Sequence, residues 1–164
     1  MQYQIGDKVV HPIHGVGNIV AIKEMTLNGD EPRLYYEVAI FKTRLWVLVN
    51  PPVEGRLRPI TPKSDLARYH LLLKSRPLPL ENNYRIRQND LITRFKSGTF
   101  QALCEIVRDL RARKTFRSLS EFDTTLLSKA SDYLFEEWAV MNEVTKNEAA
   151  LDVEALLVQG QSKQ

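Results

Sequence analysis

The spacing of hydrophobic positions changes near residue 62, and the change predicts two kinds of secondary structure. Before it, short apolar runs separated by turn residues are typical of β-strands. Asn28-Gly29-Asp30 indicates a tight hairpin, because Asn and Gly accept the positive φ of such a turn. Asn50-Pro51-Pro52 ends the last long run, since proline cannot donate to a neighbouring strand. These features predict a small β-barrel of the SH3 or Tudor type.

From Ser64 onward the apolar residues recur three and four positions apart, which is the period of amphipathic α-helices. Residues 77–79 contain two prolines and are expected to stop the first helix. The third helix carries Arg108 and Arg111 on the face opposite its apolar residues. The expected N-terminal caps are Ser64 for the first helix, Asn82 or Asn83 for the second, Ser120 with Asp123 for the fourth, and Thr145 with Glu148 for the fifth.

The predicted fold class is therefore α+β with two domains. Residues 1–62 are expected to form the small Tudor/SH3-like β-barrel, and residues 63–158 an all-α bundle of about five helices. Residues 159–164 are expected to be a frayed tail.

Length and composition point to an ordinary globular protein. The chain has 164 residues, of which 43% are hydrophobic, so it can build a core. It has no run of about 18 apolar residues and no secretory signal pattern at its start. Its single cysteine, Cys104, excludes an internal disulfide. We expect a cytoplasmic protein without a membrane segment.

Charge is distributed unevenly along the chain. Residues 83–117 carry nine Lys or Arg and three acidic residues, whereas residues 118–164 carry three basic and nine acidic residues. A polarised charge distribution orients a protein on a polyanion such as DNA. A solvated helix face remains the alternative. The supporting cations expected on the third helix are Arg108, Arg111, Arg113 and Lys114.

Tyr84 is the most informative single residue of the basic stretch. It follows Glu81-Asn82-Asn83, so it is expected at a helix start, flanked by Arg85 and Arg87. An aromatic ring at a basic helix terminus is suited to wedge against a base step while the cations hold phosphates. A ring packed against a neighbouring helix is an equally open interpretation at this point.

Catalytic and metal-binding patterns are not found in the sequence. His11 and His14 flank a proline and have no Cys or Asp cluster near them, so they indicate a turn rather than a metal site. Gly15-Val16-Gly17 lacks the following Lys of a phosphate loop. Cys104 lies in an apolar stretch and is predicted to be a buried thiol. We expect no enzyme, no metal and no cofactor.

Two motifs make the sequence resemble a known family across nearly its whole length. Residues 5–15, Ile-Gly-Asp-Lys-Val-Val-His-Pro-Ile-His-Gly, are similar to the opening of the CarD/CdnL family of bacterial RNA-polymerase-binding transcription regulators. Residues 106–110, Ile-Val-Arg-Asp-Leu, followed by Leu119-Ser120, match a second family motif. The opening motif alone is of middling specificity, and the two motifs in this order are specific.

The resemblance implies a Tudor-like N-terminal domain that binds the RNA polymerase β subunit, and a helical domain that touches promoter DNA at the upstream edge of the bubble. The family's wedging aromatic, usually Trp, falls on Tyr84, and Arg85 and Arg87 fall among its backbone-contacting cations. Tyr offers less stacking area than Trp, which implies a weaker wedge.

The resemblance also implies where the polymerase binds. Two family arginines that contact the β subunit fall on Met25 and Leu48, so this contact is expected to be more apolar here. The residues expected at this surface are Met25, Thr26, Leu27, Trp46, Leu48 and Asn50.

The function expected from the sequence is that of a monomeric transcription regulator, associated with the nucleoid through RNA polymerase, that stabilises the open promoter complex. Its affinity for free DNA is expected to be weak and not sequence-specific. One alternative is a polymerase-bound adaptor whose helical domain recruits proteins instead of DNA. Another is an RNA- or ribosome-associated protein, suggested by the basic charge and the small barrel.

Overall fold

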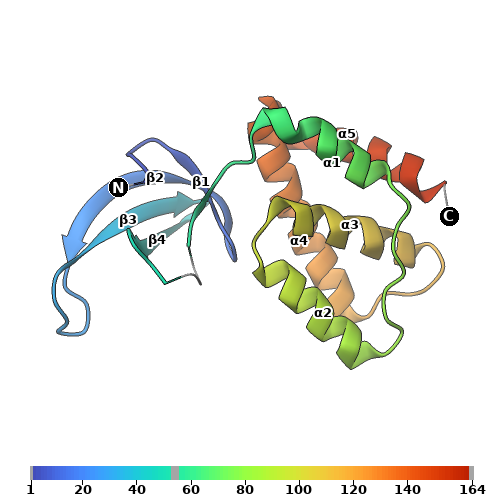
Figure 1. Ribbon diagram of the computed structural model, residues 1–164, viewed down its shortest axis with the longest axis horizontal. Helices are drawn as coiled ribbons and strands as arrows, with labels where there is room; N and C mark the ends of the chain where they lie inside the picture. The colour runs from blue at the N-terminus through green and yellow to red at the C-terminus, as the bar shows by residue number, and fades with distance from the viewer. Residues whose placement is uncertain (1, 53–55, 163–164) are drawn as a thin grey trace. The chain divides into compact units, whose positions relative to one another are not determined.

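The computed structural model describes residues 2–52 and 56–162, and the chain divides into two compact units, Met1–Ile60 and Thr61–Gln164. The first is a β unit and the second is helical (Figure 1). The α+β architecture with an antiparallel sheet followed by helices is therefore confirmed.

The β unit is built on one antiparallel sheet, which has five strands among the described residues, in the order β4-β3-β2-β1-β5. The hairpin between β2 and β3 turns where the sequence predicted it, with positive φ at both Asn28 and Gly29. The core is formed by the inward face of the sheet, with Tyr3 packing edge-to-face on Tyr36. The strands are β1 (Lys8–His11), β2 (Gly15–Met25), β3 (Arg33–Ile40), β4 (Thr43–Leu48) and β5 (Arg58–Pro59).

The helical unit is arranged around α3, which packs against α1, α2 and α4, while α5 packs against α1 and α4. Its core is one apolar cluster in which Trp138, Leu134, Ile106 and Leu110 are almost completely buried. The described helices are η1 (Lys63–Asp65), α1 (Leu66–Lys74), α2 (Tyr84–Lys96), α3 (Phe100–Lys114), α4 (Glu121–Asn142) and α5 (Lys146–Gln161).

The helix starts follow most of the predicted caps. Asn83, Ser120 and Thr145 each accept a hydrogen bond from a first-turn backbone N–H, and Thr145 forms a complete capping box with Glu148. The prediction that Ser64 caps the first helix is wrong. Ser64 lies inside the short η1 turn, and α1 begins after it with no side-chain cap.

The C-terminal residues are more ordered than the sequence indicated. Helix α5 continues to Gln161, so residues 159–161 of the expected frayed tail are helical, and residues 163 and 164 lie outside the described residues. Gly160 explains this order because it is buried against α1. A Cβ built at Gly160 would lie 2.8 Å from the carbonyl oxygen of Ser75 and 2.9 Å from that of Leu73. The missing side chain lets the two backbones approach closely.

The start of the helical unit is held by a buried carboxylate. Glu137 of α4 is fully buried and accepts hydrogen bonds from the backbone N–H of Thr61 at 3.0 Å and from its hydroxyl at 2.8 Å. Thr61 is thereby bound to a helix 76 residues further along the chain.

Candidate functional site

Tyr84 is the first residue of α2, and its ring is open to solvent. The side chain of Asn83 accepts a hydrogen bond from the backbone N–H of Ile86 at 3.1 Å, which fixes the start of the helix. The Tyr84 side chain is 47% exposed, and its ring centroid lies 5.7 Å from the guanidinium carbon of Arg87. The structure thus places an aromatic ring at a helix terminus with a cation against one face.

Arg87, although it lies against the Tyr84 ring, is only 5% exposed and so is not a surface cation. Its Nε donates to Asp123 Oδ2 at 2.9 Å, and its Nη1 donates to the carbonyl oxygens of Glu81 and Asn82 at 3.0 and 3.1 Å. This guanidinium is occupied by internal acceptors, which does not agree with the expectation that Arg87 contacts a DNA phosphate. Through these hydrogen bonds Arg87 connects the loop before Tyr84 to Asp123 of α4.

Arg108 is also buried, so the prediction that it lies on the solvent face of α3 is wrong. Its Nε donates to Asp109 Oδ1 at 2.8 Å, and its Nη1 donates to the hydroxyl of Ser75 at 3.0 Å. Asp109 Oδ1 also accepts from the backbone N–H of Leu78 at 3.0 Å. The physical reason is that α3 is central: three helices pack against it, and Arg108, Asp109 and Arg113 are buried with its apolar residues.

Arg113 is the third buried arginine that the sequence placed on the surface. Its Nε is buried and has no hydrogen-bond partner among the described residues. Burial lowers the pKa of Arg113, the nearby charges of Arg87 and Arg117 lower it further, and Asp123 opposes them. The main cause is that burial removes the charged guanidinium from water.

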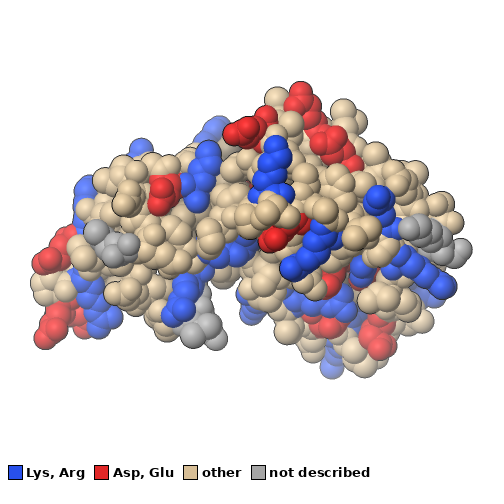
Figure 2. All heavy atoms as spheres, turned by 45° about the horizontal axis from the view of Figure 1, so that its top comes forward, with Lys and Arg blue, Asp and Glu red and all other residues tan. Residues whose placement is uncertain are grey.

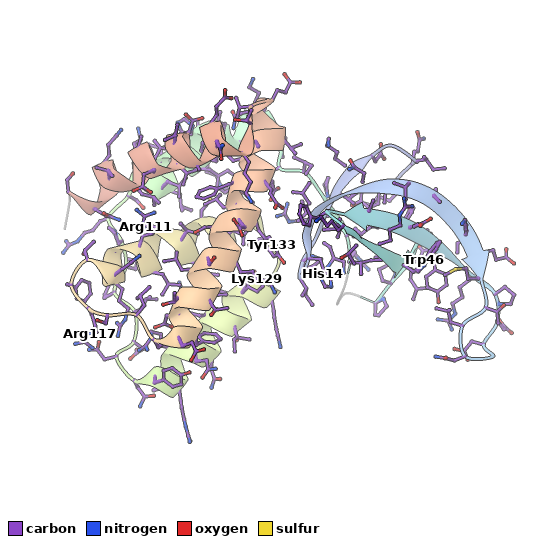
Figure 3. The ribbon with its side chains drawn as sticks, turned by 180° about the vertical axis from the view of Figure 1, so that it is seen from behind. His14, Trp46, Arg111, Arg117, Lys129 and Tyr133 are labelled. Atoms are coloured by element: carbon purple, nitrogen blue, oxygen red, sulfur yellow. The ribbon has the colours of Figure 1, made fainter. Side chains whose placement is uncertain are left out.

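The cations left on the surface form a smaller set than predicted. Arg85 and Lys114 are exposed, and no described residue pairs with either. Arg111 is half-buried and donates through Nη1 to Glu154 of α5 at 2.6 Å. Arg117, which the sequence did not single out, is exposed on the connection from α3 to α4, and its Nη1 donates to Asn82 Oδ1 at 3.0 Å (Figure 3). Arg117 is therefore tied to the loop that leads into Tyr84.

The two signs of charge mix over the helical unit. In the view of Figure 2, Lys and Arg side chains are scattered over the front of this unit among uncharged residues, and Asp and Glu side chains lie at its upper edge and again in its lower part. The face seen there therefore carries both signs of charge.

The β unit brings three of the predicted polymerase residues onto one face of the sheet. Leu48 of β4 is in register with Tyr35 of β3, Trp46 is in register with Glu37, and Met25 of β2 pairs with Arg33. Side chains alternate along a strand, and Tyr36 points into the core, so these partners share the outward face.

The other predicted polymerase residues lie beyond the strand ends. Thr26 and Leu27 are exposed in the turn after β2, and Asn50 is exposed just after β4. Trp46 is 40% exposed, and the Nζ of Lys23 lies 5.4 Å from its ring centroid (Trp46 is labelled in Figure 3). Because β4 is an edge of the sheet, this face carries an aromatic and aliphatic surface at the sheet's rim.

The remaining candidate chemistry is structural. His11 Nδ1 accepts hydrogen bonds from the backbone N–H groups of Ile13 and His14, as expected for a turn. Cys104 is a buried thiol, as predicted. Within residues 2–52 and 56–162 there is no group of three or more His, Cys, Asp or Glu residues arranged to hold a metal. No helix in the described part of the chain combines the length and the apolar character needed to cross a membrane.

Both units match models of known domains. Residues 3–52 match the CarD-like/TRCF RID domain, an RNA-polymerase-interacting domain, and residues 70–154 match the CarD C-terminal domain. A protein of Bacillus subtilis (strain 168), named "Putative transcription factor YdeB", is 29% identical over 154 residues, which cover 89% of this chain and 96% of that protein. The order of the two domains is the one that the sequence motifs indicated. On these matches, the chain belongs to the CarD family of non-enzymatic transcription regulators.

Proposed function

We propose that this protein binds the β subunit of RNA polymerase through its β unit and stabilises the open promoter complex through its helical unit. In this role, Tyr84 contacts DNA at the upstream edge of the bubble and slows its closure. The protein acts in the cytoplasm, on the nucleoid, wherever the polymerase carries it.

The observation that carries the proposal is the setting of Tyr84. Its ring is exposed at the start of α2, while the loop before it is fixed by the hydrogen bonds of Arg87 to Glu81 and Asn82. A wedge has to be rigid, because a mobile ring loses its stacking energy to the entropy of ordering it. The buried arginine supplies that rigidity.

The electrostatic contribution comes from the exposed cations. Arg85 follows Tyr84 directly, and Arg117 is joined to Asn82, so both cations lie beside the wedge. Such a small set gives weak, salt-dependent affinity for free DNA. Binding becomes effective when the polymerase raises the local concentration of the helical unit at the promoter.

The polymerase contact is assigned to the outward face of β2, β3 and β4, with Trp46 and Leu48 on its edge strand β4. The register places both side chains on the same side of an edge strand. An exposed aromatic beside aliphatic residues is typical of the centre of a protein interface.

The test is the lifetime of the open promoter complex formed with purified polymerase. We expect Tyr84→Ala to shorten this lifetime about fivefold or more, because stacking of a base on an aromatic ring contributes about 1–3 kcal/mol. Leu151→Ala is the matched control, since Leu151 is an exposed apolar residue on α5. An unchanged lifetime with Tyr84→Ala excludes the wedge.

Tyr84→Trp gives an independent check of the same role. A larger ring offers more stacking area, so this variant is expected to lengthen the lifetime of the open complex. If Tyr84→Ala, Tyr84→Trp and Arg85→Ala all behave as the natural protein while the polymerase still binds, the helical unit acts as a protein-recruiting adaptor instead.

A further inference from the structure

A groove runs beside the segment that connects α1 to α2. Its volume is about 410 Å³. It lies between residues 76–80 on one side and, on the other, Ala112 and Arg113 of α3 with Phe116 in the turn that follows. Volumes of this size are typical of sites that hold a small, largely apolar group. The groove takes no part in the role proposed for Tyr84.

Phe116 gives the groove an exposed aromatic wall. Its side chain is 66% exposed, and Leu78 on the facing segment is 58% exposed. The turn that carries Phe116 is ordered, because its backbone N–H and that of Arg117 both donate to the carbonyl oxygen of Arg113, at 3.2 and 3.0 Å. The backbone at Phe116 is therefore held in place, while its ring is open to solvent.

The groove is also positively charged. Arg113, which lines it, is 5% exposed and has a buried Nε without a hydrogen-bond partner among the described residues. Arg76 is exposed at the other wall, and no described residue pairs with it. The acidic residue of the lining, Asp109, already accepts from Arg108 and from the backbone of Leu78. The groove therefore favours an anionic ligand that also brings an apolar surface.

The turn of Phe116 is joined to the loop before Tyr84. Arg117, the next residue, donates to Asn82 Oδ1 at 3.0 Å, and Asn82 precedes Tyr84 by two positions. The turn of Phe116 therefore lies against the loop that leads into Tyr84.

We propose that this groove binds an unpaired nucleotide of single-stranded DNA, with its base against Phe116 and its phosphate near Arg76. A base is a flat apolar ring with polar edges, which suits Phe, Pro and Leu walls near the positive charges of Arg76 and Arg113. Paired bases expose only their edges in the grooves of a duplex, so the site selects melted DNA. The inference rests on the proposed function, because unpaired nucleotides occur where the promoter has opened.

The test uses the full chain and two fluorescein-labelled 12-mers at low salt, oligo(dT) and an abasic strand of equal charge. Fluorescence anisotropy is expected to show tighter binding of oligo(dT) than of the abasic strand. Phe116→Ala should weaken oligo(dT) binding about five- to tenfold and change abasic binding less than about twofold, because only the stacking contribution is lost. Phe116→Tyr should restore the preference, and Arg76→Gln should weaken binding of both strands.

Two outcomes overturn the inference. One is equal affinity for the two strands, which would mean that the protein attracts the phosphate backbone and does not bind the base. The other is a Phe116→Ala variant that keeps its oligo(dT) affinity. If that variant also binds the polymerase more weakly, the groove binds a protein segment instead of DNA. Because Phe116 is mostly exposed, its loss should leave the thermal midpoint nearly unchanged, and this is checked first.

Failure of this inference is distinguishable from failure of the proposed function. Phe116→Ala without effect, together with a shortened open-complex lifetime for Tyr84→Ala, rejects the groove and keeps the wedge. The reverse pattern keeps the groove and rejects the wedge.

Discussion

Arg87 and Asp123 form an ion pair inside the helical unit, with 2.9 Å between Nε and Oδ2, although 36 residues separate them in the sequence. The pair joins α2 to the first turn of α4. Nη1 of Arg87 holds the loop before Tyr84, so one buried side chain links the helix packing to the position of the exposed ring.

Loss of this pair is expected to destabilise the protein strongly. Arg87→Ala leaves Asp123 buried without its cation, and removing one partner of a buried pair costs about 3–5 kcal/mol. The measurement is the free energy of unfolding in urea. Arg85→Ala is the control, since Arg85 is exposed and its loss should change stability by no more than about 0.5 kcal/mol. Equal unfolding midpoints for the two variants would contradict a structural role for Arg87.

The polymerase surface is tested separately by mutation of the sheet. Leu48→Glu places a charge on the outward face beside Tyr35 and should weaken binding to the isolated β subunit at least about tenfold, as expected for a charge in the apolar centre of an interface. Leu151→Glu on α5 is the matched control, because it adds the same charge at an exposed leucine of the other unit. Surface plasmon resonance gives both affinities. If Leu48→Glu kept full affinity, the polymerase would have to bind another face of the protein.

Gly160 allows a sharp test of the packing between α5 and α1. Gly160→Ala brings a methyl group to 2.8 Å from the carbonyl oxygen of Ser75, and the backbone must shift to relieve it. Overpacking of this kind costs about 1–3 kcal/mol, which opposes the gain of about 1 kcal/mol that Ala gives to a helix. We expect a lower thermal midpoint than for Gln159→Ala at the exposed neighbouring position. A stabilised Gly160→Ala variant would show that α5 ends without close packing.

The β unit is expected to lose stability in weak acid through His11. Burial lowers the pKa of His11, and the neighbouring His14 lowers it further. Because the folded-state pKa lies below the unfolded value of about 6.5, this contribution is complete above about pH 6.5 and decreases as the pH falls toward the folded pKa. The structural reason is that Nδ1 accepts two backbone N–H groups and must be unprotonated.

His11→Asn keeps a side-chain acceptor for the same turn and cannot titrate. Thermal melts at pH 7.5 and 5.5 should therefore show a smaller loss of the midpoint for this variant than for the natural protein. The same loss in both proteins would assign the acid sensitivity to other groups.

Local patterns predicted most of the helical unit because helix caps and periodicity depend on near neighbours. Asn83, Ser120 and Thr145 cap the helices that their sequence contexts indicated, and each does so within three residues. The sheet face was predictable for a similar reason, since strict alternation separates Tyr35 from the buried Tyr36.

Charge alone did not predict whether the arginine side chains would be buried or exposed. Whether an arginine of α3 faces water depends on which helices cover α3, and those contacts join distant parts of the chain. A signal was nevertheless present in the sequence. An acidic residue next to an arginine can serve as its partner when both are buried. The adjacent Arg108 and Asp109 form such an internal pair.

The hydrogen bonds between Thr61 and Glu137 determine where the chain can be cut. A helical fragment that begins at residue 63 lacks Thr61 and with it two hydrogen bonds to a carboxylate that is completely buried in α4. Such a fragment is expected to express poorly or unfold at a lower temperature than one that begins at residue 59. A fragment meant to contain the whole helical unit must therefore include Thr61, which precedes the first helix.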